Sequence, residues 1–152
     1  MQVKTDQDSE YQPKYDFPSE IPFLRDLGAE FVKMEGGESE VSLLVKARHC
    51  NSWGVTHGGV VMTLLDVAMS MAARSLEAEA HGGLTIEMKT SFMQPSGSVG
   101  KRIRAIGRVS HRAKSFLFCD GEVWDGDTLA AKAMGTFKLV RRLDAAKKLE
   151  HG

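Results

Sequence analysis

The sequence predicts an α+β fold in which a curved antiparallel sheet wraps around one long central helix. Three observations support this expectation: a β-type run folded at a Gly-Gly pair, a long apolar stretch rich in Ala, Leu and Met, and four alternating segments after it. Alternating strands joined by short turns indicate an antiparallel sheet with one covered face. A helix that is apolar nearly all round must be buried, so the sheet is expected to curve around it.

The first elements follow in order along the chain. A short helix is expected between Ser19, which can cap it, and Gly28, which can end it. Residues 29–35 and 39–47 are typical of two strands, and the Gly-Gly pair between them is typical of a hairpin turn. Residues 60–80 have the length and composition of a helix rather than a strand.

The second half of the chain is predicted to be a four-strand meander. Gly82-Gly83 is expected to end the helical region, and alternating segments follow it. The first of these segments alternates Leu84, Ile86 and Met88 with polar residues. Asp125-Gly126-Asp127 is a strong hairpin signal between the last two. The four strands are expected at residues 84–94, 101–110, 115–124 and 128–140.

The 152 residues fit one domain. Residues 1–18 lack periodicity and are predicted to be a flexible N-terminal arm, residues 19–142 the folded domain, and residues 143–152 a C-terminal tail. The start of the chain is polar and acidic and has no apolar stretch suited to a signal peptide, so the cytoplasm is the expected compartment.

Charge and cysteine content argue against several classes of partner. Lys plus Arg and Asp plus Glu each total 20, so the net charge is zero and gives no general attraction to nucleic acid or an anionic membrane. Charged residues interrupt the apolar helix too often for a membrane span. Cys50 and Cys119 show no metal-ligand spacing, while a disulfide between them stays open. We expect no metal and no cofactor.

Asp66 is the most informative residue of the predicted helix. Its neighbours are almost all apolar, and a carboxylate among them costs several kcal/mol unless it is hydrogen-bonded or paired. One interpretation is a structural group satisfied by a partner such as an arginine. The other is a catalytic carboxylate.

The loop before the helix favours the catalytic interpretation. His57-Gly58-Gly59 lies where the helix begins, and the first N–H groups of a helix have no internal partner. Glycine lets a ligand approach that backbone closely, and the helix dipole favours negative charge there. The loop can therefore receive a developing oxyanion. Gly58 and Asp66 are about 12 Å apart along the helix axis, too far to touch one carbonyl group within a single chain.

Residues 51–73, NSWGVTHGGVVMTLLDVAMSMAA, resemble the signature of the hot-dog thioesterase superfamily, particularly its PaaI-like (phenylacetate-degradation) acyl-CoA thioesterase branch. The pattern has an Asn, a Gly shortly before His-Gly-Gly, and an apolar helix start that ends in an Asp. The resemblance extends over about residues 25 to 140, and it implies a hot-dog fold.

The resemblance also implies roles for individual residues. Asp66 would activate water or attack the thioester carbonyl, and the N–H of Gly58 would polarise that carbonyl, with His57 beside it. Asn51 would place the carbonyl or water from the other chain of a homodimer, and Thr85 would lie near the catalytic acid. Relatives also form dimers of dimers. Acyl-CoA is the implied substrate.

Basic residues supply a weaker signal. Arg102, Arg104 and Arg108 are interpreted as a solvated sheet face, whereas a predicted turn is expected to meet the CoA phosphates. The residues of this predicted turn are His111, Arg112 and Lys114. With Gly59, they are the predicted substrate-binding residues. The methionines are interpreted mainly as an adaptable core, some of them lining an acyl tunnel.

Two other functions stay open at this stage. Hot-dog hydratases and dehydratases also act on acyl thioesters, although they pair a loop His with a Glu or Asp differently. A non-catalytic acyl-CoA binding module would contain Asp66 only as a satisfied buried group. The spacing from His-Gly-Gly to Asp66 resembles that of the thioesterases.

Overall fold

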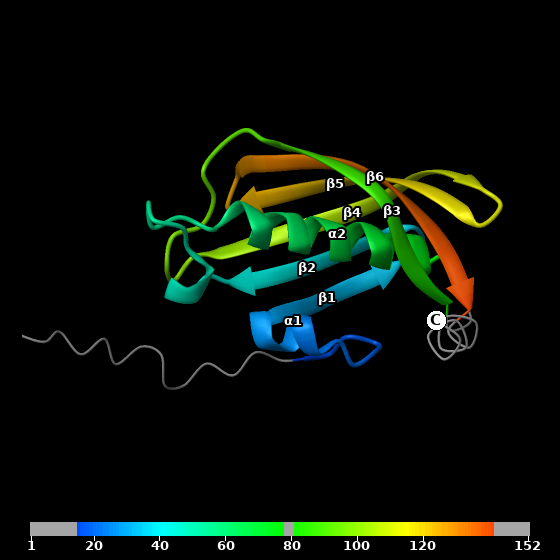
Figure 1. Ribbon diagram of the computed structural model, residues 1–152, viewed down its shortest axis with the longest axis horizontal. Helices are drawn as coiled ribbons and strands as arrows, with labels where there is room; N and C mark the ends of the chain where they lie inside the picture. Colours follow the sequence, from blue (N-terminus) through cyan, green and yellow to red (C-terminus); the bar gives the residue numbers. More distant parts are fainter. Residues whose placement is uncertain (1–14, 78–80, 142–152) are drawn as a thin grey trace, which may run out of the picture.

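The structure, a computed structural model, describes residues 15–77 and 81–141 and confirms the predicted α+β fold. Within the described residues one antiparallel sheet contains six strands in the order β1-β2-β4-β5-β6-β3, and it curves around α2 (Figure 1). The elements are α1 (Pro22–Leu27), β1 (Ala29–Glu35), β2 (Glu38–Leu44), the 3-10 turn η1 (Ala47–His49), α2 (Gly58–Arg74), β3 (His81–Phe92), β4 (Arg102–Ala113), β5 (Phe116–Asp125) and β6 (Thr128–Arg141).

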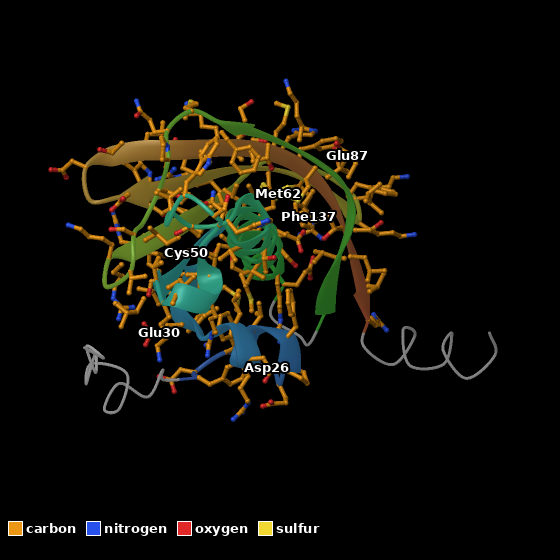
Figure 2. The ribbon with its side chains drawn as sticks, turned by 60° about the vertical axis from the view of Figure 1, so that its left-hand side comes forward. Asp26, Glu30, Cys50, Met62, Glu87 and Phe137 are labelled. Carbon is orange, nitrogen blue, oxygen red and sulfur yellow. The ribbon has the colours of Figure 1, made fainter. Side chains whose placement is uncertain are left out.

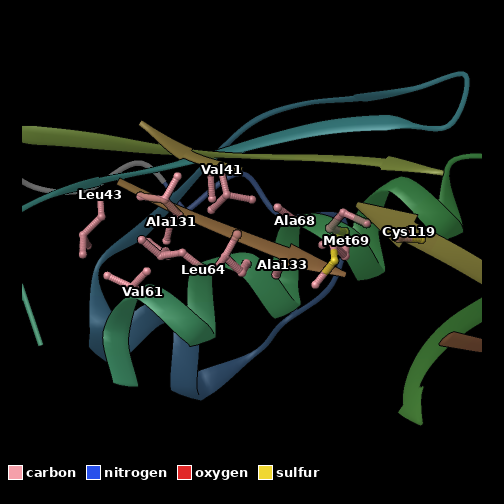
Figure 3. Packing of buried hydrophobic residues seen from close by; sticks show 14 of the residues in the cluster. Val41, Leu43, Val61, Leu64, Ala68, Met69, Cys119, Ala131 and Ala133 are labelled. Atoms are coloured by element: carbon pink, nitrogen blue, oxygen red, sulfur yellow. The ribbon is translucent and has the colours of Figure 1, made fainter. Parts of the chain in front are cut away.

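The core lies between α2 and the concave face of the sheet (Figure 3). Leu64, Leu65 and Ala68 of α2 are completely buried. They pack with inward-facing residues of the strands, among them Val41 of β2 and Ala131 of β6. The alternation of apolar residues along β2, β4, β5 and β6 therefore identifies the covered face correctly, as expected for a sheet solvated on its other side.

Gly107 of β4 sets the closest approach of α2 to the sheet. A Cβ atom added at Gly107 would lie 2.3 Å from the Ala68 carbonyl oxygen and 2.7 Å from the Met69 nitrogen. Both atoms belong to the helix backbone and cannot move aside alone. The Ser39 hydroxyl donates a hydrogen bond to the same Ala68 carbonyl, so β2 and β4 hold the helix at one point.

The predicted meander is wrong for one strand. β3 pairs with β6, while β4 pairs with β2, so only β4, β5 and β6 form a meander. The chain crosses the concave face along α2 and therefore reaches the far edge of the sheet before β3 begins (Figure 1). Gly82-Gly83 lies inside β3 rather than ending the helix. The strand passes close to α2 at Gly83, where an added Cβ would lie 2.6 Å from the Ser70 hydroxyl.

The ends of both helices also differ from expectation. Ser19 does not cap α1, which begins at Pro22 after the extended residue Ile21. Proline presets the first helical φ and has no N–H that needs a cap. Gly28 ends α1 as predicted, at a φ of 82°. α2 ends at Arg74 instead of continuing to residue 80, and residues 78–80 lie outside the described residues.

The predicted N-terminal arm is described from residue 15 onward. Phe17 is buried, and Tyr15 packs beside it with 5.2 Å between the ring centroids. The C-terminal tail at residues 143–152 lies outside the described residues. In the described part of the chain, no helix is long and apolar enough to cross a membrane.

The two cysteines do not form a disulfide. Cys50 is half-buried beside η1, and Cys119 is buried on β5. Burial, together with the nearby Asp120 carboxylate, raises the pKa of the Cys119 thiol to about 12. Cys119 therefore stays a neutral core side chain.

A bulge reverses the sides of β3. The pairing of β3 with β6 shifts between Thr85 and Glu87. The apolar residues Leu84 and Ile86 are 51% and 53% exposed, against the expectation that the apolar set covers the core. One extra residue in a strand reverses which side chains face inward beyond it, and Thr85 thereby lies on the α2 side.

His49 fixes η1, and with it the loop that leads into α2. Its ring is 2% exposed. The Nδ1 atom accepts the Lys46 N–H at 2.9 Å, so Nε2 carries the proton and donates it to the Leu27 carbonyl at 2.7 Å. Burial lowers the pKa of His49; the Leu27 bond opposes this shift, and the neighbouring charge of Arg48 adds to it.

Replacing Gly107 with alanine is expected to lower the free energy of unfolding by about 3 kcal/mol, because the new Cβ meets helix backbone. Gly82→Ala is the matched control, since a Cβ there has nothing within 4 Å. Urea unfolding measures both. Equal stabilities of the two variants would contradict this account of the helix–sheet contact.

Acid is expected to destabilise the fold partly through His49. The folded-state pKa lies below the unfolded value of 6.5, so the contribution of neutral His49 is complete above pH 6.5 and is lost as the pH falls through the folded-state pKa. Unfolding free energies measured from pH 7.5 to 5 should fall less steeply for His49→Asn than for the wild type. His111→Gln, which replaces an exposed histidine, should keep the wild-type slope; an identical slope for His49→Asn would refute the assignment.

Candidate functional site

Asp66 lies midway along α2 on the side that faces β3. Its side chain is half-buried, and its Oδ1 atom accepts a hydrogen bond of 2.6 Å from the Thr85 hydroxyl. No arginine or lysine within the described ranges forms an ion pair with it. The arginine-paired alternative is therefore not what the structure contains. Among the described residues, the other carboxylate oxygen of Asp66 has no hydrogen-bond donor.

Asp66 and Thr85 line a pocket of about 530 Å³ between α2, β3 and α1. Figure 2 shows α2 beneath the arched sheet with α1 below it, and labels Met62, one of the lining residues. Volumes of roughly 300–1,000 Å³ are usual for small-molecule sites. The walls of this pocket are mostly apolar, and Asp66 is the one ionisable residue among the described residues that line it. The lining residues are Ile21, Phe23, Leu24, Met62, Thr63, Asp66, Val67, Ser70, Met71, Gly83, Thr85 and Met88.

The N-terminus of α2 is capped by the His57 ring. Nδ1 accepts the Gly59 N–H at 2.9 Å, so the neutral ring carries its proton on Nε2. The His57 carbonyl accepts from Val60 and Val61. The Gly58 N–H has no acceptor among the described residues. It is an unpaired donor at the positive end of a helix.

Asn51 shapes the loop ahead of α2. Its Oδ1 accepts from the Trp53 N–H at 2.9 Å and from the Val55 N–H at 3.4 Å. The side-chain NH₂ group has no acceptor within the described chain. Thr56 anchors the end of the loop by donating to the Gly97 carbonyl at 2.9 Å. The loop therefore uses the Oδ1 atom of Asn51 as an acceptor and leaves its NH₂ group able to donate to a ligand.

Asn51 and Gly58 line a different pocket from Asp66. This second pocket measures about 260 Å³ and lies between the loop and the end of β3, bordered by Phe92 and Met93. The two pockets have no residue in common. Within one chain, the donors at the helix N-terminus and the Asp66 carboxylate thus line separate pockets.

The basic residues at the end of β4 and in the turn after it lie apart from both pockets. Only Lys114 lies in that turn, because β4 extends to Ala113 and includes His111 and Arg112. His111 packs beside Phe118 with 5.9 Å between ring centroids, and Lys114 adopts a positive φ of 58°. Arg112 forms an ion pair with Glu77 and donates from Nε to the Lys114 carbonyl at 2.9 Å. None of the three basic residues lines either pocket.

The three strand arginines lie on the outer face of the sheet. Arg104 pairs with Glu40 at 3.3 Å and Arg108 with Glu38 at 3.3 Å, while Arg102 pairs with Glu30. This arrangement agrees with a solvated sheet face. No group of three or more His, Cys, Asp or Glu side chains in the described ranges could hold a metal ion.

The methionines divide between core and pocket. Met69 is completely buried, whereas Met62, Met71 and Met88 line the pocket beside Asp66. Met134 is 57% exposed and belongs to neither. The sequence analysis missed α1 as a wall of this pocket. No motif marks α1, and only the tertiary structure brings it against α2.

Comparison with known proteins agrees with this geometry. Residues 54–132 match the model of the thioesterase superfamily. A protein of Saccharolobus solfataricus named "Putative esterase SSO1253" is 32% identical over 81% of both chains. Mouse acyl-coenzyme A thioesterase 13 is 28% identical over 60% of this chain and 64% of its own. The solved structure of Escherichia coli PaaI superposes with a TM-score of 0.71 at 24% identity, covering 78% of this chain and 83% of that one.

The family model spans more than half of the chain and includes α2 with both Gly58 and Asp66. The resemblance read from residues 51–73 is thereby confirmed, as is the hot-dog fold. The chain belongs to the thioesterase superfamily.

Proposed function

We propose that the protein hydrolyses acyl-CoA thioesters to a free acid and CoA, with Asp66 as the catalytic carboxylate. The observation that carries the proposal is the half-buried Asp66, which accepts a hydrogen bond from Thr85 at the polar end of an apolar pocket. Even a half-buried carboxylate among apolar walls loses some of its hydration, and no cationic partner among the described residues compensates for that loss. Membership of the thioesterase superfamily and the name of the mouse relative support the same reaction.

Hydrolysis needs an activated nucleophile and a place for negative charge on the carbonyl oxygen. Asp66 would take a proton from water as the water oxygen bonds to the carbonyl carbon. The C–S bond then breaks, and the CoA thiolate leaves with the electron pair and is protonated. Direct attack by the carboxylate, followed by hydrolysis of the anhydride, is the second route. In both routes Thr85 would hold the Asp66 carboxylate in place.

The Gly58 N–H would stabilise the oxyanion, since it lies at a helix N-terminus and has no acceptor among residues 15–77 and 81–141. The amide NH₂ of Asn51, which borders the same pocket, would supply a second donor. His57 would act by capping the helix and fixing the loop beside the substrate. Gly59 would lie beside the substrate at the helix start, although its N–H donates to His57 and neither pocket lining includes it.

The two half-sites would combine across a homodimer. β3 is an edge strand of 12 residues, and its exposed apolar side chains include Leu84, Ile86 and Phe92. Long apolar edges favour pairing with another strand. The Phe92 ring lies 3.5 Å from the Cβ position of Gly58, while Thr85 bonds Asp66. A twofold axis through the middle of β3 would therefore bring the Gly58 end of one subunit towards the Asp66 side of its partner.

The proposed contacts with the CoA phosphates rest on the positive charge of three side chains. His111, Arg112 and Lys114 would meet the CoA phosphates at the edge of the assembled site, because all three are exposed and basic. Arg112 would have to exchange or share its ion pair with Glu77. A dimer of dimers stays a prediction, and a solution mass would test it.

Asp66→Asn is expected to lower kcat for acyl-CoA hydrolysis about 10³-fold, because the amide can neither accept the proton nor attack. Release of free thiol from short, medium and aromatic acyl-CoAs measures the loss. The variant keeps an oxygen that can accept from Thr85, so its stability should match the wild type.

The exposed Asp120→Asn on β5 is the control and should retain full activity. A wild type that binds CoA but releases no thiol from any thioester would instead indicate a binding module. Consumption of an enoyl-CoA without thiol release would indicate a hydratase.

A mixture of two inactive variants is expected to recover activity if the site spans two subunits. Asp66→Asn and Asn51→Ala each damage one half-site. In their heterodimer one site contains both defects and the other contains none. Random mixing of equal amounts should therefore restore about a quarter of the wild-type activity per subunit.

Mixing by co-expression, followed by thiol assay and determination of the solution mass, provides the test. The same variant carrying two different tags, mixed with itself, is the control and should stay inactive. A mixture without recovery, or a solution mass of one chain, would rule out the cross-subunit site.

A further inference from the structure

We propose that α1 forms the acyl-contacting wall of the pocket beside Asp66, with Phe23 as its main contact, and that the preferred substrates are thioesters of uncharged, apolar acyl groups. This inference rests on the proposed function and names the acyl class that the same site accepts. It assigns a specificity-determining role to a helix that carries no recognisable motif.

The pocket has one polar end and otherwise mostly apolar walls. Asp66 and Thr85 mark the polar end, and Met62 and Phe23 contribute walls from α2 and α1. Phe23 is 63% exposed and Met62 is 38% exposed, although both are large apolar side chains. An acyl tail lying in the pocket would cover this surface, and removing apolar surface from water favours binding.

The charge of the pocket argues against acyl groups that end in a carboxylate. Among the described residues that line the pocket, Asp66 is the one ionisable group, and none of them is a lysine, arginine or histidine. A second carboxylate would lose water without gaining a cation and would be repelled by Asp66. Arg74, one turn beyond Ser70 on α2, donates to the Ser19 hydroxyl at 2.9 Å and is not part of the lining.

Several contacts hold α1 in a defined position. At its start, the Ile21 N–H donates to the Tyr15 hydroxyl, which in turn donates to the Ser19 carbonyl at 2.8 Å. At its end, the Leu27 carbonyl accepts hydrogen bonds from His49 and Arg48. The fully buried Leu24 anchors the helix between them and also borders the pocket.

A wall fixed in this way can act as a specificity element, because its contacts are formed before the substrate arrives. Phe23 is well suited to this role. Its ring borders the pocket, yet most of its surface is not needed to stabilise the fold.

The test compares kcat/KM for acetyl-, butyryl-, hexanoyl- and octanoyl-CoA in the wild type and in Phe23→Ala. In the wild type kcat/KM should rise with chain length. Phe23→Ala should lower the octanoyl value about 10-fold and change the acetyl value less than about twofold, since only the longer chain reaches α1. Phe23→Leu should restore part of the loss. Val32→Ala on β1, a 49% exposed apolar residue outside the pocket, should follow the wild type.

A second comparison uses succinyl-CoA, whose acyl group ends in a carboxylate. Its kcat/KM should be at least about 10-fold lower than that of butyryl-CoA. Equal rates for these two substrates would overturn the assignment of an uncharged acyl group. An unchanged chain-length profile in Phe23→Ala would overturn the role of α1 while leaving thioester hydrolysis intact. A wild type inactive on every thioester would refute the proposed function itself, and this inference with it.

Discussion

The contact between α2 and β4 constrains the rest of the molecule. Gly107 leaves no room for a side chain beneath the Ala68 carbonyl, so the helix backbone lies directly against the sheet. One side of α2 is thereby committed to the core. Asp66 and Ser70 lie on the side that faces β3, where a polar group meets hydroxyls and a pocket instead of close-packed apolar atoms. A carboxylate on a buried helix is tolerable only on such a side.

A single helix supplies two chemically different features. Its N-terminus presents the Gly58 N–H, which has no acceptor in the described part of the chain, and its middle presents the Asp66 carboxylate. The rigidity of the helix keeps them about 12 Å apart along the axis, so they cannot converge within one subunit. Within the described residues β3 runs past both features and has no strand on its outer edge, and the proposed homodimer would use that edge.

Much of the architecture could be predicted from periodicity, although one strand could not be placed. The covered faces of β2, β4, β5 and β6 follow their apolar alternation. Alternation indicates which face of a strand is covered, but not which strand lies beside it, so the pairing of β3 with β6 was missed. The bulge after Thr85 has no signature in the sequence, yet it reverses the exposure of Leu84 and Ile86.

The sequence by itself determined the class of elements and the family, and it singled out Asp66, Gly58 and Asn51 as candidate site residues, because local composition and a short motif carry that information. The resemblance placed Thr85 near the acid, and the tertiary structure added the hydrogen bond between Thr85 and Asp66. Only the tertiary structure decided that the Gly59 N–H is occupied by His57 and that α1 borders the pocket. These relations depend on how distant segments pack. Packing sums many weak contacts over the whole chain, so no local pattern encodes it.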